Sequence, residues 1–511
     1  MIASAKETQE AVAQTPASDM SVETIQRRAT GGLLSLALRR AVHQVISFFG
    51  NILLSRLLSP SVFGVFSIVT YVVNFFGFFG DIGLGAALVQ RKEKPSERVL
   101  RTTFTIQQSL VTFFVIMVFV ASPFISKKYG MSESSVWLFR AFSLSLFFTS
   151  MKVIPSILLE RQLYFNRIII PEIAEVAAYQ TVAVTMAYMG YGVWSLVCAT
   201  LARGVLGFTI LFILSPWKLG YAFDKPTAKD LVKFGAPFQL GQFFWLIKNA
   251  ATPVFAGFVC GKAAVGYLTW AWGLALVPYT IIEIINRIVF PVCSRLQHDK
   301  DMLGRSIEKF VRMSSIGVFG IAAVMMAVAP YAIKYVYTAK WTPALPALYL
   351  FLLSMMGGPI INIYSRSFYA IGRAKTAVKL TAAYVGLSWI FNVPLLLKYG
   401  FVGIAWSALL VTVIGVWLPI REMEKIVHVQ IWKQVWAPLI SACGTLALTR
   451  WIAVKAVDGV LTLVGVTLVG MAIYAVFMLL LQRETLIAEG KMFVTMVRRQ
   501  EEDAAAPEFD G

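Results

Sequence analysis

The stretch GVLTLVGVTLVGMAIYAVFMLLL (459–481) decides the class of this protein, because no charged side chain interrupts it. A helix rises 1.5 Å per residue, so about 20 apolar residues cross the roughly 30 Å hydrocarbon core of a bilayer. Similar stretches recur along the chain. They predict an all-α, polytopic membrane protein with about fourteen transmembrane helices, at residues 32–57, 62–84, 102–125, 136–158, 168–189, 193–214, 234–258, 264–290, 313–336, 344–368, 377–397, 401–420, 435–455 and 459–481.

The composition agrees with a lipid environment. Of 511 residues, 58% are hydrophobic and 14% are charged, with a mean hydropathy of +0.71, which is outside the usual soluble range. The polar ends are expected to be cytoplasmic tails, a disordered one at 1–29, without a signal-peptide pattern, and one at 484–511. The four cysteines lie far apart without CxxC spacing, so neither a metal site, a disulfide framework nor a cofactor is indicated.

Lysine and arginine are distributed unequally between the two sets of loops. By the expected spans, one set contains about 22 of these residues and the other about nine. Positively charged loops resist translocation, so we expect a bacterial inner-membrane protein with both termini in the cytoplasm. The net charge of +19 is spread between apolar segments, so it predicts contact with membrane lipids and not with nucleic acid.

An internal repeat divides the chain. A shift of about 202 residues lays LLSPSVFGVFS (57–67) over VCGKAAVGYLT (259–269), with Gly64 on Gly266, and a shift near 212 matches GYGVWSLV (190–197) with VGIAWSAL (402–409). The repeat predicts two six-helix lobes, 30–216 and 217–425, related by a pseudo-twofold axis, plus two appended helices within 426–483, with the substrate path between the lobes. The alternative is that such glycine-aromatic turns recur by chance.

Two expected spans carry polar faces. The first has polar residues three or four apart, and the span at 234–258 repeats the pattern. An unpaired charge inside a membrane costs about 2.5 to 3.5 kcal/mol on insertion scales, so we expect both faces to line a central cavity. The residues concerned are Arg39, Arg40, His43, Gln44, Ser47, Asn51 and Ser55 in the first span, and Gln239, Gln242, Trp245, Lys248, Asn249 and Thr252 in the other.

We assign these residues to two roles. A cationic set would bind an anion, since guanidinium forks donate hydrogen bonds in pairs to a diphosphate, and it comprises Arg39, Arg40, His43 and Lys248. A polar set would contact sugar, and it comprises Gln44, Asn51, Gln242, Trp245 and Asn249. In the alternative interpretation, the two arginines reach out to cytoplasmic headgroups and His43 is a packing residue.

Other charged residues lie near helix ends. Glu283 and Arg287 are four residues apart and are candidates for a structural or coupling ion pair. Two interpretations remain open for Glu172, Glu175, Arg140 and Arg203, namely contact with the cavity and contact with the membrane interface. Isolated carboxylates and short outer connections form no catalytic or metal-binding cluster, so we do not expect an enzyme.

Three segments resemble a known family, namely SRLLSPSVFGVFSIV (55–69), DIGLGAALVQRKE (81–93) and LLERQLYFNR (158–167). They are similar to the polysaccharide transporter family of the multidrug/oligosaccharidyl-lipid/polysaccharide exporter superfamily, which includes Wzx-like flippases. The resemblance implies two six-helix lobes and the flipping of undecaprenyl-diphosphate-linked oligosaccharide to the periplasmic leaflet, for exopolysaccharide or O-antigen synthesis. It also implies a polysaccharide polymerase and co-polymerase as candidate partners.

Two other functions remain as alternatives. A cation-coupled multidrug exporter would prefer a carboxylate-lined cavity, and the first expected span has no acidic residue. A membrane polysaccharide polymerase or ligase would need a carboxylate cluster or a long outer loop. We therefore favour a transporter that works by alternating access on an anionic, lipid-linked saccharide.

Overall fold

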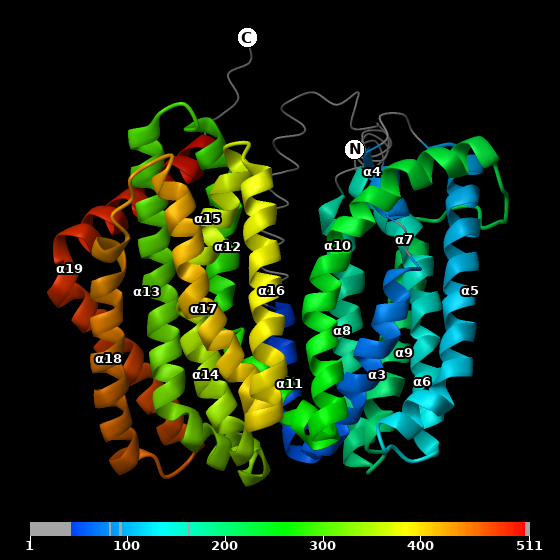
Figure 1. The fold of residues 1–511 in the computed structure, drawn as a ribbon, viewed down its shortest axis with the longest axis horizontal. Helices are drawn as coiled ribbons and strands as arrows, with labels where there is room; N and C mark the ends of the chain where they lie inside the picture. The colour runs from blue at the N-terminus through cyan, green and yellow to red at the C-terminus, as the bar shows by residue number, and fades with distance from the viewer. Residues whose placement is uncertain (1–41, 81–82, 91–94, 162–163, 506–511) are drawn as a thin grey trace, which may run out of the picture. The chain divides into compact units, whose positions relative to one another are not determined.

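A computed structural model describes residues 42–80, 83–90, 95–161 and 164–505, and all regular secondary structure within these ranges is helical (Figure 1). This confirms the all-α prediction. The expected tail at 1–29 lies outside the described residues. By its contacts the chain divides into two compact units, one ending at Thr269 and one starting at Trp270. The division into lobes after residue 216 stays a prediction.

The first unit begins with a helix over residues 42–57. It continues with α3 (Pro60–Phe78), α4 (Leu84–Gln90), α5 (Glu97–Lys128), α6 (Ser134–Ser143), α7 (Ser145–Arg161), α8 (Phe165–Tyr188), α9 (Val193–Leu214), α10 (Lys225–Cys260) and the start of α11 (Lys262–Ala275).

Short polar side chains set the starts of three of these helices. Ser59 precedes α3, Ser96 precedes α5 and Asp224 precedes α10, and each accepts a hydrogen bond from a backbone N–H three residues on. Such caps satisfy donors that have no partner inside the helix.

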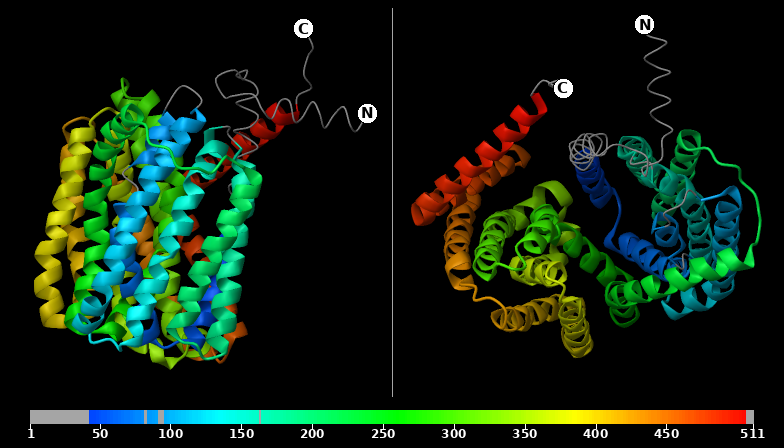
Figure 2. Two further views of the ribbon diagram at one scale, coloured as in Figure 1. Left: turned by 90° about the vertical axis from the view of Figure 1, so that its right-hand side faces the viewer. Right: turned by 90° about the horizontal axis from the view of Figure 1, so that it is seen from above.

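The second unit is also helical. It contains α12 (Tyr279–Arg295), α13 (Lys300–Ala332), a π-helical turn (Ile333–Tyr337), a 3-10 helix (Ala339–Ala344), α14 (Leu345–Met355), α15 (Gly358–Ala370), α16 (Ala374–Tyr399), α17 (Phe401–Glu424), α18 (Ile431–Ala456) and α19 (Val460–Ala505). In Figure 1, α13 runs beside α18 and α14 beside α17. At Gln482 the backbone of α19 leaves the helical region, and the rest of this helix lies across the direction of its neighbours (Figure 2).

Ten helices of the described chain are long and apolar enough to cross a membrane, or twelve if two bent pairs each count as one span. A multi-pass membrane protein is therefore confirmed, and the count of about fourteen stays a prediction. Only residues 42–57 of the first expected span are described. The expected span 234–258 lies inside α10, which is not among the ten.

Three expected spans are not continuous helices. The span 136–158 is interrupted at Leu144, between α6 and α7. The span 264–290 bends by 51° between α11 and α12, and the span 344–368 bends by 43° between α14 and α15. Proline explains both bends, because Pro278 precedes α12 and Pro359 lies in the first turn of α15, and proline has no N–H for the helical hydrogen bond.

Candidate functional site

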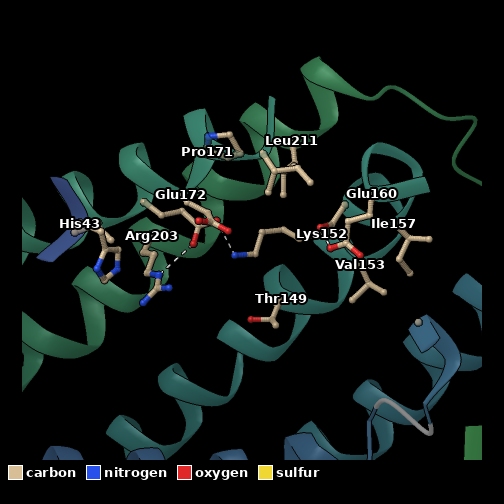
Figure 3. A pocket seen from close by; sticks show the side chains of 15 residues that line it. His43, Thr149, Lys152, Val153, Ile157, Glu160, Pro171, Glu172, Arg203 and Leu211 are labelled. Atoms are coloured by element: carbon tan, nitrogen blue, oxygen red, sulfur yellow. Dashed lines mark hydrogen bonds and ion pairs between the residues drawn. The ribbon is translucent and has the colours of Figure 1, made fainter. Parts of the chain in front are cut away.

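A cavity of about 870 Å³ opens within the first unit. Its walls come from the helix over 42–57, α4, α7, α8 and α9, and Figure 3 shows the side chains that line it. The helical repeat aligns the polar residues of α7 on one face, because they are three or four positions apart. The polar residues that line the cavity are His43, Thr149, Lys152, Ser156, Glu160, Glu172, Glu175 and Arg203.

An ionic cluster connects three of these helices. Glu175 on α8 is almost fully buried, with 7% of its side chain exposed. Its Oε1 lies 2.8 Å from Nζ of Lys152 on α7, and its Oε2 lies 3.1 Å from Nε of Arg203 on α9 (Figure 3). Each carboxylate oxygen therefore has its own cationic partner, which is what a charge buried at membrane depth requires.

A glycine on α9 makes room for this carboxylate. A Cβ atom at Gly207 would lie 1.9 Å from Oε1 of Glu175, so no larger residue fits there without moving the glutamate. Gly207 is one helical turn beyond Arg203, so the same face of α9 supplies both the cation and the space. The local sequence of α9 thus determines where Glu175 lies.

Arg203 is the cation best placed to contact a ligand. It pairs with Glu175 through Nε, 49% of its side chain is exposed, and it is one of the residues that line the cavity. The two terminal nitrogens of its guanidinium group lie beyond the contact with Glu175, on the side of His43 (Figure 3). A guanidinium group held in this way is oriented for the paired donation of hydrogen bonds that a phosphate accepts.

Two further carboxylates, those of Glu160 and Glu172, line the same cavity. Glu160 accepts a 3.4 Å hydrogen bond from Oγ of Ser156, and Glu172 lies one turn before Glu175 on α8. Ionised carboxylates only accept hydrogen bonds, so they suit the hydroxyl groups of a sugar. The cavity therefore combines donors for an anion with acceptors for hydroxyl groups.

The cationic set expected from the sequence is only partly described. His43 lines the cavity beside Arg203 (Figure 3). Arg39 and Arg40 lie outside the described residues. Lys248 belongs to α10, and its side chain is not described, which also holds for Gln242, Trp245 and Asn249. The roles of these residues stay predictions.

The polar face expected for the first span is divided between two environments. Ser55 is buried with Leu54 and Leu58, and these leucines pack on residues of α8 and α9. Gln44 and Asn51 are exposed and are not among the residues that line the cavity described here. The reason is that the apolar side of this helix, including Gly50 against Gln180, packs on α8.

Two further predicted groups have different outcomes. Glu283 and Arg287 lie one turn apart on exposed positions of α12, and their pairing stays a prediction. Arg140 lies on α6 and donates from Nε to Oγ of Ser122 at 3.3 Å, with its guanidinium over the Trp137 ring, so it connects α6 to α5.

Sequence reasoning missed one residue of the cluster. Glu175 and Arg203 were among the residues with two open interpretations, whereas Lys152 was not singled out. Its position in the sequence could have identified Lys152, because it lies inside the expected span 136–158. An ionisable residue within a membrane span indicates a charged partner or a functional site.

Comparison with known proteins gives related sequences over most of the chain. The profile of a family described as "Polysaccharide biosynthesis protein" matches residues 53–346. The teichuronic acid biosynthesis protein TuaB of Bacillus subtilis is 26% identical over 306 residues, which are 58% of this chain and 62% of TuaB. The succinoglycan biosynthesis transport protein ExoT of Rhizobium meliloti is 22% identical over 59% of this chain and 61% of ExoT. The chain thus spans about three fifths of the length of these two relatives.

A third relative and two solved structures extend the match. The lipopolysaccharide biosynthesis protein WzxC of Escherichia coli is 25% identical over 78% of this chain and 82% of WzxC. The lipid II flippase MurJ in an inward closed conformation superposes with a TM-score of 0.74 at 16% identity, over 89% of this chain and all of MurJ.

An inward-facing multidrug resistance MATE transporter of the MOP superfamily superposes with a TM-score of 0.58 at 15% identity, over 77% of this chain and 98% of the transporter. At these identities the two structures show a common fold only. The family profile covers more than half of the chain, and the protein is therefore a member of the polysaccharide biosynthesis protein family, with the fold of MOP-superfamily transporters.

Proposed function

We propose that this protein flips undecaprenyl-diphosphate-linked oligosaccharide repeat units from the cytoplasmic to the periplasmic leaflet of the bacterial inner membrane, for exopolysaccharide or O-antigen synthesis. Membership of the family supports this, as do the relatives ExoT and WzxC, whose names refer to succinoglycan biosynthesis transport and lipopolysaccharide biosynthesis. On this proposal the protein is a transporter that works by alternating access, and not an enzyme.

The observation that carries the proposal is the position of Arg203. Its Nε is held by the buried Glu175, and its half-exposed side chain lines a cavity that Glu160 and Glu172 also line. Phosphate oxygens would accept from the guanidinium, while sugar hydroxyl groups would donate to the carboxylates. A saccharide attached to a diphosphate carries both kinds of group.

Other parts of the proposal rest on the sequence alone. We include Arg39, Arg40 and Lys248 as further cations for the diphosphate, and both termini in the cytoplasm, because positively charged loops stay on that side. The lobes at 30–216 and 217–425 would move against each other, as repeat-related halves of transporters do. A polysaccharide polymerase and co-polymerase would receive the product.

A multidrug exporter is the second candidate function, and one observation favours it. Three carboxylates line the cavity, from Glu160, Glu172 and Glu175, and carboxylates attract organic cations. One observation argues against an exporter of organic cations. Glu175 already has two cationic partners at 2.8 and 3.1 Å, so its charge is compensated without a ligand.

The test is flipping in proteoliposomes that contain labelled undecaprenyl-diphosphate-linked oligosaccharide. Arg203→Lys keeps the positive charge but removes the planar guanidinium group, which donates two parallel hydrogen bonds to a phosphate. Each lost hydrogen bond to a charged group is worth about 1.5 to 3 kcal/mol. We expect the half-saturating cargo concentration to rise about tenfold or more. Arg140→Lys is the matched control, because Arg140 belongs to the α5–α6 contact, and it should leave this concentration unchanged.

The same vesicles distinguish the two candidate functions. If wild-type protein moves no lipid-linked saccharide but transports cationic dyes, the flippase proposal is wrong and the exporter remains. If Arg203→Lys matches wild type at sub-saturating cargo, the phosphate contact assigned to Arg203 is wrong.

A further inference from the structure

The connection between α9 and α10, residues 216–224, is fixed against the beginning of α5 (Figure 1). The backbone N–H of Ala222 donates to Oγ1 of Thr105 at 3.1 Å. The rings of Trp217 and Phe104 lie edge to face, with their centroids 5.2 Å apart. The connection therefore has a defined position on α5, although it contains no regular secondary structure.

This position is at the boundary of the membrane. The candidate span α9 ends at Leu214, two residues before the connection begins. α5 has 32 residues, which give a length of about 48 Å and exceed the roughly 30 Å hydrocarbon core. Because Glu97, Arg98 and Arg101 are charged, the excess length belongs to the beginning of α5, which is the part that the connection contacts. The connection is therefore expected at the level of the lipid headgroups.

One side of the connection is exposed and apolar. Exposure alternates from Leu219 to Asp224, as in an extended chain whose successive side chains point to opposite sides. The exposed members are Leu219, Tyr221 and Phe223, with exposed fractions of 47%, 75% and 66%. Tyrosine is enriched where a membrane meets water, and leucine and phenylalanine at this level enter the boundary between headgroups and acyl chains. This side therefore suits contact with lipid.

Two exposed cations accompany the apolar side. Nζ of Lys218 lies 3.3 Å from Oε1 of Glu97. Nη2 of Arg98 lies 2.8 Å from Oδ1 of Asp224. Ion pairs that involve strongly exposed side chains contribute little to stability, so either cation can exchange its carboxylate for another anion.

Arg101 is a third cation, and its hydrogen bonding is incomplete. Among the described residues its side chain has one acceptor, Oε2 of Glu97 at 3.5 Å from Nη2, and its buried Nε has none. Gly220 leaves room for this guanidinium group, because a Cβ atom at the glycine would lie 3.2 Å from Nε. Glu97 also pairs with Lys218, so the lysine and the arginine are close together. A phosphate group at this point would accept charge-assisted hydrogen bonds from both.

We propose that this part of the first unit binds an anionic membrane lipid. Its headgroup phosphate contacts Arg101 and Lys218, and its acyl chains lie along the apolar side of residues 219–223. Cations next to exposed apolar side chains are the combination that binds anionic lipid at a membrane surface, whereas a free phosphate ion gains nothing from the apolar side chains. None of these residues lines the cavity that contains Arg203, so this lipid is separate from the cargo of the proposed function.

Lipid binding to the purified full chain tests the proposal. Phosphatidylglycerol or phosphatidylcholine is added in detergent, and bound lipid is counted by native mass spectrometry. We expect the wild type to bind phosphatidylglycerol more tightly. Arg101→Gln with Lys218→Gln should lower this affinity about tenfold or more, and it should change the binding of phosphatidylcholine little, because that headgroup has no net charge.

A matched control removes the same two charges elsewhere. Arg373→Gln with Lys375→Gln takes one arginine and one lysine from exposed positions of the second unit, and it should leave phosphatidylglycerol binding unchanged. Equal losses in the two double variants, or no loss in either, would mean that no specific site exists. Inorganic phosphate should not displace the lipid at equal concentration. Displacement would show that the site takes a free anion, and the lipid assignment would be wrong.

A charge-preserving variant guards against misfolding. Arg101→Lys with Lys218→Arg keeps both cations and should retain phosphatidylglycerol binding. If it loses binding as fully as the glutamine variant, the loss comes from disturbed structure and not from lost charge, and the proposal is wrong.

The depth of the apolar side is measured in liposomes. The four native cysteines are replaced by serine, and a spin label is attached at Leu219→Cys. We expect this label to collide more often with oxygen, which concentrates in lipid, than with a water-soluble nickel complex. A label at His298→Cys, in the exposed connection between α12 and α13, should show the opposite preference. If the two labels behave alike, the connection lies in water, its partner is not a lipid, and the proposal is wrong.

Discussion

Oε2 of Glu175 accepts a 3.1 Å hydrogen bond from Nε of Arg203, although the two residues are on different helices and 28 positions apart. The same carboxylate pairs with Lys152, so one side chain connects α7, α8 and α9. This arrangement fixes the guanidinium orientation on which the proposed phosphate contact depends.

Glu175→Gln should destabilise the first unit. The substitution keeps the shape but removes the charge that both cations need, and hydrogen bonds to charged groups contribute about 1.5 to 3 kcal/mol each. Because Arg203 is half exposed, its ion pair with Glu175 should contribute little to folding stability. Most of the lost stability should therefore come from the pair with Lys152. We expect a lower unfolding temperature in detergent. Lys152→Gln with Glu175→Gln should be more stable than Glu175→Gln alone, and equal unfolding temperatures for all three proteins would contradict the pairing.

Gly207→Ala should displace Glu175, since the new Cβ atom would lie 1.9 Å from its Oε1. We expect weaker cargo binding together with a lower unfolding temperature. Gly465→Ala on α19 is the control, because no atom lies within 4 Å of a Cβ atom there. Alanine favours a helix over glycine by up to about 1 kcal/mol, so this variant should be as stable as wild type or more so. Similar behaviour of both variants would show that Gly207 does not position Glu175.

The N-cap of α10 should make stability depend on pH. Hydrogen bonds from Thr227 and the nearby Arg98 hold the pKa of Asp224 below its ordinary value. A depressed folded-state pKa stabilises the folded protein above the unfolded-chain value of about 3.9, and this contribution is lost as pH falls through the folded-state value. Wild type should therefore unfold at a higher temperature than Asp224→Asn near pH 6, with the difference shrinking below pH 4. A difference that stays constant down to pH 3 would show that the charge of Asp224 plays no part.

The C-terminus is expected in the cytoplasm, on the evidence of the loop charges. Fusion of a fluorescent reporter after Gly511 should give a fluorescent protein, and fusion of a periplasm-dependent phosphatase at the same point should be inactive. Phosphatase activity would mean an odd number of spans, and the two-lobe proposal would then need revision.

The sequence predicted where the helices lie along the chain better than it predicted which helices pack together. The expected span 193–214 coincides with α9, because apolar length is a local property of the chain. The bends at Pro278 and Pro359 were not predicted, because the length of an apolar stretch gives no information on whether its helix is straight. The ionic cluster was missed as a unit, since its members lie on three helices and nothing in the sequence shows which helices pack together. Gly64 and Gly266, which the 202-residue shift matches, lie close together, but the repeat by itself predicts no contact between them, and the two lobes stay a prediction.

The cluster around Glu175 also has a consequence for biosynthesis. Lys152 leaves the ribosome 23 residues before Glu175, which is roughly one to five seconds at ordinary elongation rates. An isolated lysine at the centre of a helix costs about 2.5 to 3.5 kcal/mol on translocon insertion scales. For that interval α7 enters the bilayer without its counter-charge, and α9 brings the arginine later still. The three helices are thus expected to leave the translocon as a group, with the glutamate neutralising its neighbours before lipid surrounds them.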